Sequence, residues 1–154
     1  FDQAMRLHNV IGTMIEVERN LGAFKNQVDE RSSTARELRG DAAKDLAKAS
    51  REELVKLDSV RLQLTRPKPD RVPYYSEGPR PLERAMSLMG AIDAGLTPVI
   101  EAQREYMGDV RRDAQTVIDM VERQIEATAG RINPLLQALG LPPLLVPPKR
   151  STRM

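Results

Sequence analysis

Residues 7–28 read LHNVIGTMIEVERNLGAFKNQV, and apolar side chains recur in this stretch at alternating steps of three and four residues. The spacing places these side chains on a single face of an α-helix, so the stretch predicts a long amphipathic helix. Because no proline interrupts the surrounding sequence, the helix is expected to run from Asp2 to Leu38. The apolar positions are Leu7, Val10, Met14, Val17, Leu21, Phe24 and Val28.

A second helix of the same kind is expected from about Ala42 to Thr65. Gly40 is expected to end the first helix, since glycine takes a positive φ at low cost, and Asp41 is expected to cap the second. So short a turn makes the two helices antiparallel neighbours. Arg31 falls on the apolar face of the first helix, where its stem extends along the seam or the packing loosens. The apolar positions of the second helix are Leu46, Ala49, Leu54, Leu57, Val60 and Leu64.

A proline-rich connector follows this hairpin. Its prolines lie at positions 67, 69, 73, 79 and 81, a density that excludes a continuous helix. Tyr74 and Tyr75 lie in its middle and are expected to pin the connector against the helices. The alternative is that the two rings form a platform for a ligand.

Two further helices and a tail are predicted beyond the connector. The third helix starts near Pro81 and is expected to bury Leu82, Met86, Met89 and Ile92. The fourth starts at residues 97–98, is kinked or restarted at residues 133–134, and ends at Gly140. Residues 141–154 contain four prolines and then three basic residues. This segment is expected to lie extended over the helices at first and to be free at its end.

These elements predict an all-α fold, an antiparallel four-helix bundle made of two helical hairpins. Residues 1–65 form the first hairpin, 66–81 the proline-rich connector, 82–140 the second hairpin, and 141–154 an extended basic tail. Aromatic residues make up only 3% of the 154-residue chain, so the core must consist of aliphatic residues, methionine and alanine. Long helices that share a narrow, coiled-coil-like seam tolerate such a core.

Composition also limits the classes of function. The net charge of +2 is too small to indicate nucleic-acid binding, and no apolar run is long enough to span a membrane. The absence of cysteine excludes disulfides and thiolate chemistry. The chain begins at Phe1, which suggests a fragment or a processed product.

From the connector onward, short motifs occur in a familiar order. They are residues 65–69 (TRPKP), the pair Tyr74 and Tyr75, the helix around 82–92, the start signal at 97–98, and residues 133–142 (NPLLQALGLP). This order resembles the C-terminal helical region of bacterial BNR-repeat proteins, which are exported chains described as sortilin-like or glycosyl-hydrolase-like, with an N-terminal β-propeller. The resemblance implies a periplasmic or secreted location and an accessory helical module. It carries no catalytic residue onto these positions, because the propeller is absent.

Candidate sites are few. Glu101, Glu105, Asp109 and Asp113 recur at four-residue steps and form an acidic ridge. Like charges at this spacing repel one another, so the ridge does not stabilise its own helix. One interpretation is that it is a docking strip for a basic surface. The plainer interpretation is a solvated face that is neutralised by flanking arginines. Glu52 and Lys56 have the spacing of an ordinary helical ion pair.

No cofactor or metal site is expected. The only histidine, His8, has no partner at the spacing that helical metal sites use. Neither a nucleophile triad nor a glycine-rich phosphate loop is present. Most of the methionines fall on or near the apolar stripes and are expected to fill the core rather than to line a binding groove.

The sequence therefore favours a non-catalytic structural or protein-interaction module whose partner is a protein, either its own propeller domain or another subunit. The alternatives are a helical accessory part of a secreted propeller hydrolase and a cytoplasmic helical adaptor or regulator. The first and fourth helices are longer than the two between them, so part of their apolar stripes is expected to overhang and bind the partner. The alternative is that the connector and the tail fold back over that end.

Overall fold

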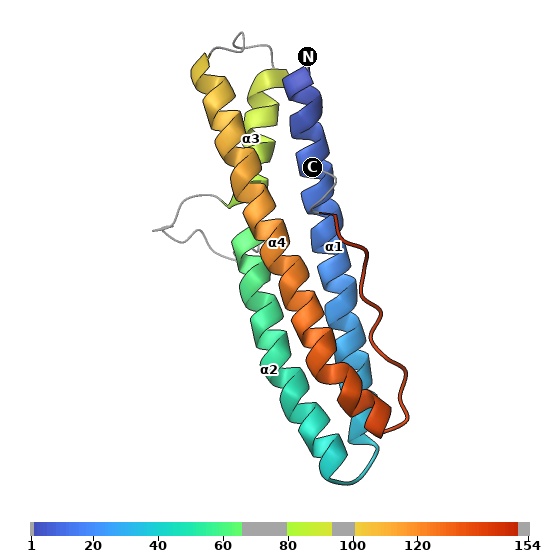
Figure 1. Ribbon diagram of the computed structural model, residues 1–154. Helices are drawn as coiled ribbons and strands as arrows, with labels where there is room; N and C mark the ends of the chain where they lie inside the picture. The colour runs from blue at the N-terminus through green and yellow to red at the C-terminus, as the bar shows by residue number, and fades with distance from the viewer. Residues whose placement is uncertain (1, 66–79, 94–100, 151–154) are drawn as a thin grey trace.

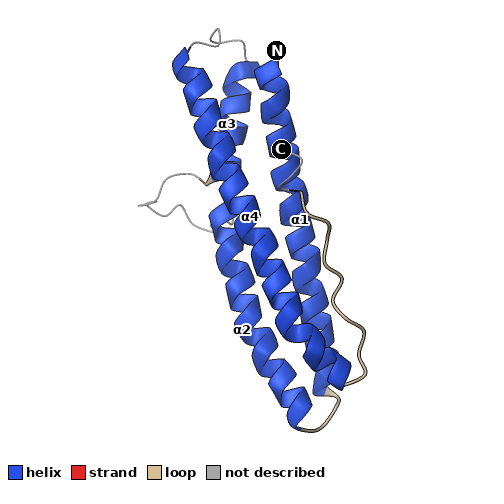
Figure 2. Cartoon of the chain, in the orientation of Figure 1, coloured by secondary structure: helices blue, strands red, loops and turns tan. Residues whose placement is uncertain are grey.

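A computed structural model describes residues 2–65, 80–93 and 101–150 of the chain. These residues form four helices and contain no strand (Figure 2). The all-α four-helix bundle is therefore confirmed. The helices are α1 (Asp2–Arg36), α2 (Asp41–Leu64), α3 (Pro81–Asp93) and α4 (Glu101–Ala138).

The two short helices follow one another along the two long ones (Figure 1). Both α2 and α3 pack against α1 and α4, and they contact each other only slightly. At 1.5 Å per residue, α2 and α3 together span about 55 Å, which is the length of each long helix. The bundle is therefore a rod in which α1 and α4 run its full length.

The expected overhang does not occur in the described residues. The apolar face of α1 is buried from Leu7 to Ala35. The prediction was wrong because it compared each short helix with a long one, whereas α2 and α3 cover successive halves of the same face. On α4 the corresponding face is buried from Met107 to Leu136, so neither of these stretches offers an uncovered stripe to a partner.

Aliphatic side chains and one aromatic ring form the core. Phe24 is the largest fully buried side chain, and it lies in one continuous cluster with residues from all four helices. Ala85 and Ala114 are completely buried on α3 and α4, where their small size allows close helix contact. Met86 is 54% exposed although it was expected to be buried, because Ala85 and Leu88 take the positions that face the core. Met5 and Met120 are also exposed.

The turn between α1 and α2 differs in detail from its prediction. Helix α1 ends at Arg36, and Gly40 is the N-cap of α2 with a φ of 124°. Asp41 is the first residue of α2, and the helix start has no side-chain cap. Near the end of α1, Ser32 rather than Arg31 continues the buried face. Arg31 lies beside the buried face of α1 rather than on it, so its side chain is available for contacts outside the core.

Helix α4 continues through Pro134 to Ala138 and does not restart there. Gly140 then has a φ of 69°, and the Leu141 N–H donates to the Leu136 carbonyl oxygen at 2.9 Å. This cap is the Schellman motif, in which a left-handed glycine reverses the chain at the end of a helix. It directs residues 141–150 back along the bundle (Figure 1).

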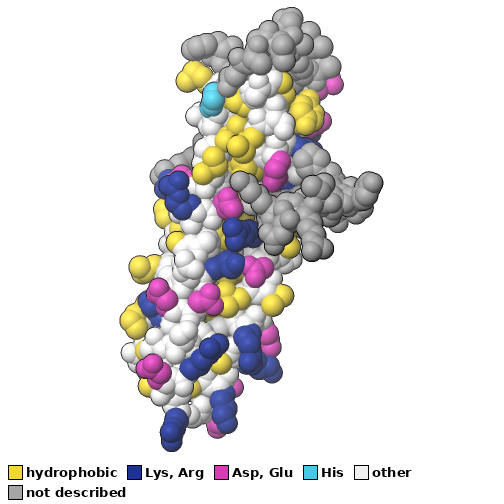
Figure 3. All heavy atoms as spheres, turned by 180° about the vertical axis from the view of Figure 1, so that it is seen from behind, with side chains coloured by type: hydrophobic (Ala, Val, Ile, Leu, Met, Phe, Trp, Pro, Cys, Tyr) yellow, Lys and Arg dark blue, Asp and Glu magenta, His cyan; other side chains and the backbone are white. Residues whose placement is uncertain are grey.

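The surface carries charges of both signs. On the face opposite to that of Figure 1, basic and acidic side chains are mixed over the lower part of the rod, whereas hydrophobic side chains gather in its upper part (Figure 3). Such mixed charge is typical of solvated helix faces and forms no single-sign field. Within the described ranges, no helix is both long enough and apolar enough to cross a membrane.

Candidate functional site

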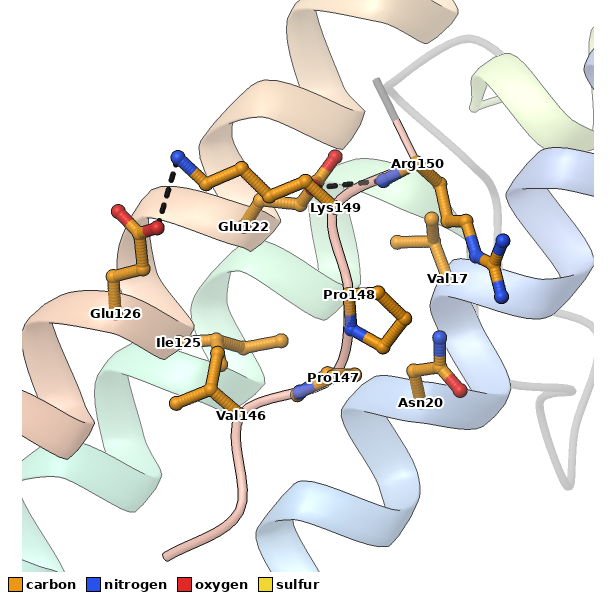
Figure 4. Close-up of a pocket in the computed structure, with 10 residues that line it drawn as sticks. All are labelled: Val17, Asn20, Glu122, Ile125, Glu126, Val146, Pro147, Pro148, Lys149 and Arg150. Carbon is orange, nitrogen blue, oxygen red and sulfur yellow. Dashed lines mark hydrogen bonds and ion pairs between the residues drawn. The ribbon is translucent and has the colours of Figure 1, made fainter. Parts of the chain in front are cut away.

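The C-terminal segment 141–150 lies in the groove between α1 and α4, and this groove is the most elaborate site among the described residues. The segment reads LPPLLVPPKR. It runs between the two long helices in an extended conformation (Figure 4). The expectation that the tail first lies over the bundle is therefore confirmed, and its last residues, 151–154, fall outside the described residues.

Two side-chain amides hold the backbone of this segment. Gln27 of α1 accepts a hydrogen bond from the Leu145 N–H at 2.8 Å and donates one to the Leu145 carbonyl oxygen at 3.1 Å. Asn133 of α4 accepts from the Leu144 N–H at 2.7 Å. Arg31 donates through Nε to the Pro142 carbonyl oxygen at 3.0 Å. These bonds are made to backbone atoms, so they select an extended chain rather than particular side chains.

Acidic residues surround the basic end of the segment. The Arg150 guanidinium lies 2.7 Å from Glu16 of α1, and the backbone N–H of Arg150 donates to Glu122 of α4 at 3.0 Å. The Lys149 ammonium lies 2.8 Å from Glu126 of α4, and this contact raises the pKa of Lys149 above its ordinary value. Carboxylates from both walls of the groove therefore complement the charge of the tail.

Apolar contacts anchor the middle of the segment. Leu144 is only 4% exposed and belongs to the core cluster, whereas its neighbour Leu145 is 71% exposed. Further along, residues 146–150 line a small, partly open pocket of about 20 Å³ together with Val17 and Ile125 (Figure 4). A pocket of this size has room for about one water molecule.

A second polar cluster lies inside the bundle, between α2 and α4. Glu53 is 3% exposed and accepts hydrogen bonds from Thr128 at 3.0 Å and from Gln124 at 3.1 Å. Arg131 donates to Glu53 at 3.2 Å and to Glu52 at 2.6 Å. Lys56 was expected to pair with Glu52, but it pairs with Glu53 at 3.6 Å. A buried carboxylate is tolerated when it is bonded in this way.

The Arg131 bridge changes the electrostatics of this cluster. Its hydrogen bond to Glu52 holds the pKa of that carboxyl below its ordinary value, and the two carboxylates raise the pKa of Arg131. These contacts therefore favour the ionised forms of both Glu52 and Arg131. Such a cluster fixes the position of α2 on α4.

The structure places the predicted acidic ridge on the exposed side of α4. Asp109 pairs with Arg112 of the same helix, and Asp113 pairs with Arg84 of α3. Glu105 is exposed. The side chain of Glu101 lies outside the described residues, as do Tyr74 and Tyr75. The ridge is thus partly neutralised, and one of its acids joins two helices.

Other candidate chemistry is limited. In the described part of the chain, no three residues of the metal-ligating types lie close enough together to hold an ion. His8 lies exposed on α1. Comparisons with protein-family models, with curated proteins and with solved structures find no match for this chain.

Sequence reasoning missed most of the groove residues, although signals were present. Glu122 and Glu126 are acidic residues four positions apart on a helix, opposite in sign to the basic end of the tail. The hydrogen-bonded pair of Glu53 and Thr128 was also indicated by the sequence, since Thr128 lies three residues after Ile125 and four before Ile132, in step with the apolar residues of the fourth helix. Glu53 lies four residues after Ala49 and is thus in register with the apolar positions of the second helix. Polar residues on two facing stripes indicate a buried hydrogen-bonded pair.

Proposed function

We propose that this chain is a non-catalytic structural or protein-interaction module. One observation supports the proposal: the ion pairs of the described residues mostly join different elements. Glu18 pairs with Arg61 at 3.4 Å between α1 and α2, and Lys25 pairs with Asp58 between the same helices. The pairs of Arg84, Arg131 and Arg150 likewise each connect two elements. The carboxylates thus serve the assembly of the bundle.

The environment of Glu52 differs from that of a catalytic acid. A general acid or base works best when its pKa lies near the working pH, which for a carboxyl requires an upward shift. The pKa of Glu52 is shifted downward by its contact with Arg131. A carboxylate that is held ionised beside a cation is suited to holding two helices together, and this favours a structural role over an enzymatic one.

The enzyme alternative is tested by assaying the purified chain against chromogenic glycosides and esters. We expect no turnover that depends on a carboxylate of α4. The variant Asp113→Asn is the informative comparison, because it removes the α3–α4 ion pair while it keeps the shape of the side chain. It should lower stability only; saturable turnover that disappears in this variant would contradict the proposal.

The same proposal places the module in an exported multidomain protein, where it packs on a propeller domain or on another subunit. Its support is the resemblance of the connector and the second hairpin to BNR-repeat proteins. The test is the complete coding region to which this sequence belongs. A signal sequence and propeller repeats upstream would support the placement, whereas a short cytoplasmic regulator would contradict it.

A further inference from the structure

From the groove contacts we infer that the α1/α4 groove is a site for an extended, proline-containing basic segment of a partner protein. The chain's own residues 141–150 are then an internal occupant that competes with the partner. The inference rests on the proposed interaction role and names the chemistry of the partner. A matching segment carries an aliphatic residue, a Pro-Pro pair three residues later, and two basic residues directly after the pair.

Backbone contacts make the groove suitable for a segment from another chain. Gln27 bonds both the N–H and the carbonyl oxygen of Leu145, in the manner of a neighbouring β-strand. Asn133 bonds the preceding N–H. None of these contacts requires that the bound segment be continuous with α4. Any extended chain of suitable side chains can therefore make them.

Side-chain contacts restrict which segments fit. Leu144 enters the core, so an aliphatic residue is required there, while Leu145 and Val146 are exposed and place little restriction on the residue type. Proline pairs favour an extended conformation before binding, and their docking therefore loses little conformational entropy. Glu16, Glu122 and Glu126 receive the basic end. The acidic end of the groove therefore fixes the direction of the bound segment.

Some of the contacts that hold the internal occupant are exposed to solvent. The ion pair between Lys149 and Glu126 is roughly half-exposed, and exposed pairs contribute little to stability. Residues 146–150 also line a small, partly open pocket against α1 and α4. The tail nevertheless has the advantage of being attached, because a tethered segment acts at a high effective concentration. A partner segment must therefore compete with it.

The test uses the full chain and a fluorescent peptide of sequence LPPLLVPPKR, whose binding is followed by anisotropy. The double variant Lys149→Glu/Arg150→Glu places acidic side chains against the acidic groove and should loosen the tail by repulsion. It should bind the peptide at least about tenfold more tightly than the wild-type chain does, because the competitor is weakened. The control variant Val55→Ser changes an exposed residue of α2 outside the groove and should behave as the wild type.

The groove itself is tested in the tail-loosened chain. Gln27→Ala should weaken peptide binding by about tenfold, because both backbone hydrogen bonds are lost. The matched control Asn26→Ala changes an exposed neighbour on α1 and should leave binding unchanged. A peptide with both basic residues replaced by Glu should fail to bind. Equal binding of the two peptides, or no effect of Gln27→Ala, would overturn the inference.

If the tail-loosened variant loses its helical circular dichroism, the wild-type chain is titrated with peptide up to about millimolar concentration, where a linked competitor can be displaced. The NMR signal of the Gln27 side-chain amide should shift, and an unchanged signal would overturn the inference. Light scattering tests whether the groove instead binds the tail of a second copy of this chain. A concentration-dependent dimer would mean that two copies exchange tails, and it would contradict the assignment to a partner protein. A folded chain that binds no peptide and shows no turnover would remove the groove assignment while leaving the non-catalytic role in place.

Discussion

Glu53 is the residue whose environment most constrains how α2 lies on α4. Its carboxylate is almost fully removed from water and meets Thr128, Gln124 and Arg131 of the facing helix. A sliding of either helix by one turn would separate these groups and leave a buried charge without partners. The cluster therefore fixes the relative position of the two helices as much as it stabilises them.

The first prediction concerns this cluster. Glu53→Ala should lower the free energy of unfolding by about 1–3 kcal/mol, because Thr128 is left buried without its acceptor. Its matched control is Glu52→Ala, which removes the 45%-exposed carboxylate that binds the same arginine. The control should cause a clearly smaller loss in urea titration. Equal losses would show that burial of Glu53 contributes nothing.

The pH dependence of stability provides a second prediction. Since Arg131 holds the pKa of Glu52 below its ordinary value of 4.5, the ionised carboxylate stabilises the folded state. This contribution is complete above about pH 4.5 and is lost as the pH falls through the lower pKa of the folded state. In the variant Glu52→Gln, the unfolding free energy should therefore fall less steeply below pH 4.5. Identical pH profiles for variant and wild type would contradict the assignment.

At the scale of the elements, helix periodicity predicted which segments are helices, and side-chain size misled the assignment of faces. The third helix shows why: its bulky residues favoured Met86 as a core residue, but the core takes the small Ala85 instead. Small residues let helices approach closely, and counting large apolar side chains overlooks them. The role of Gly40 was also misassigned, because a glycine that ends one helix and a glycine that begins the next look alike in sequence.

Helix α1 is expected to depend on its buried face. Leu21→Ala removes a fully buried side chain and should lower the free energy of unfolding by about 2–5 kcal/mol. Ile15→Ala, at an exposed position of the same helix, is the control and should have a much smaller effect. Both are measured by urea titration. A loss below about 0.5 kcal/mol for Leu21→Ala would mean that the face is not a core face.

Two glycines should respond to alanine with opposite signs. Gly140 has a positive φ at the reversal after α4, so Gly140→Ala should destabilise the protein by about 1–2 kcal/mol. Gly22 lies inside α1 with open space around it, so Gly22→Ala should stabilise the protein by about 0.5–1 kcal/mol. Thermal unfolding of both variants measures the two effects. A stabilised Gly140→Ala would show that the chain does not reverse there.

In the whole molecule, the arrangement of the helices and the tail differs most from what the sequence predicts. Helix lengths suggested an overhang for a partner, but they do not reveal that two short helices lie in line along one face. The groove was equally hidden, because it joins residues that are far apart in the chain, such as Gln27 and Leu145. Composition and periodicity report on neighbours within a helix, whereas these contacts depend on how complete elements are placed.

The central claim is that residues 141–150 are bound in the groove as a backbone-recognised segment. Amide hydrogen exchange measured by NMR on the full chain tests it most directly. The Leu144, Leu145 and Arg150 amides donate to Asn133, Gln27 and Glu122, so they should exchange more slowly than the amide of the exposed Val146. Gln27→Ala should remove the protection of Leu145 selectively. Exchange of all these tail amides at the rate of an unfolded peptide would contradict the account.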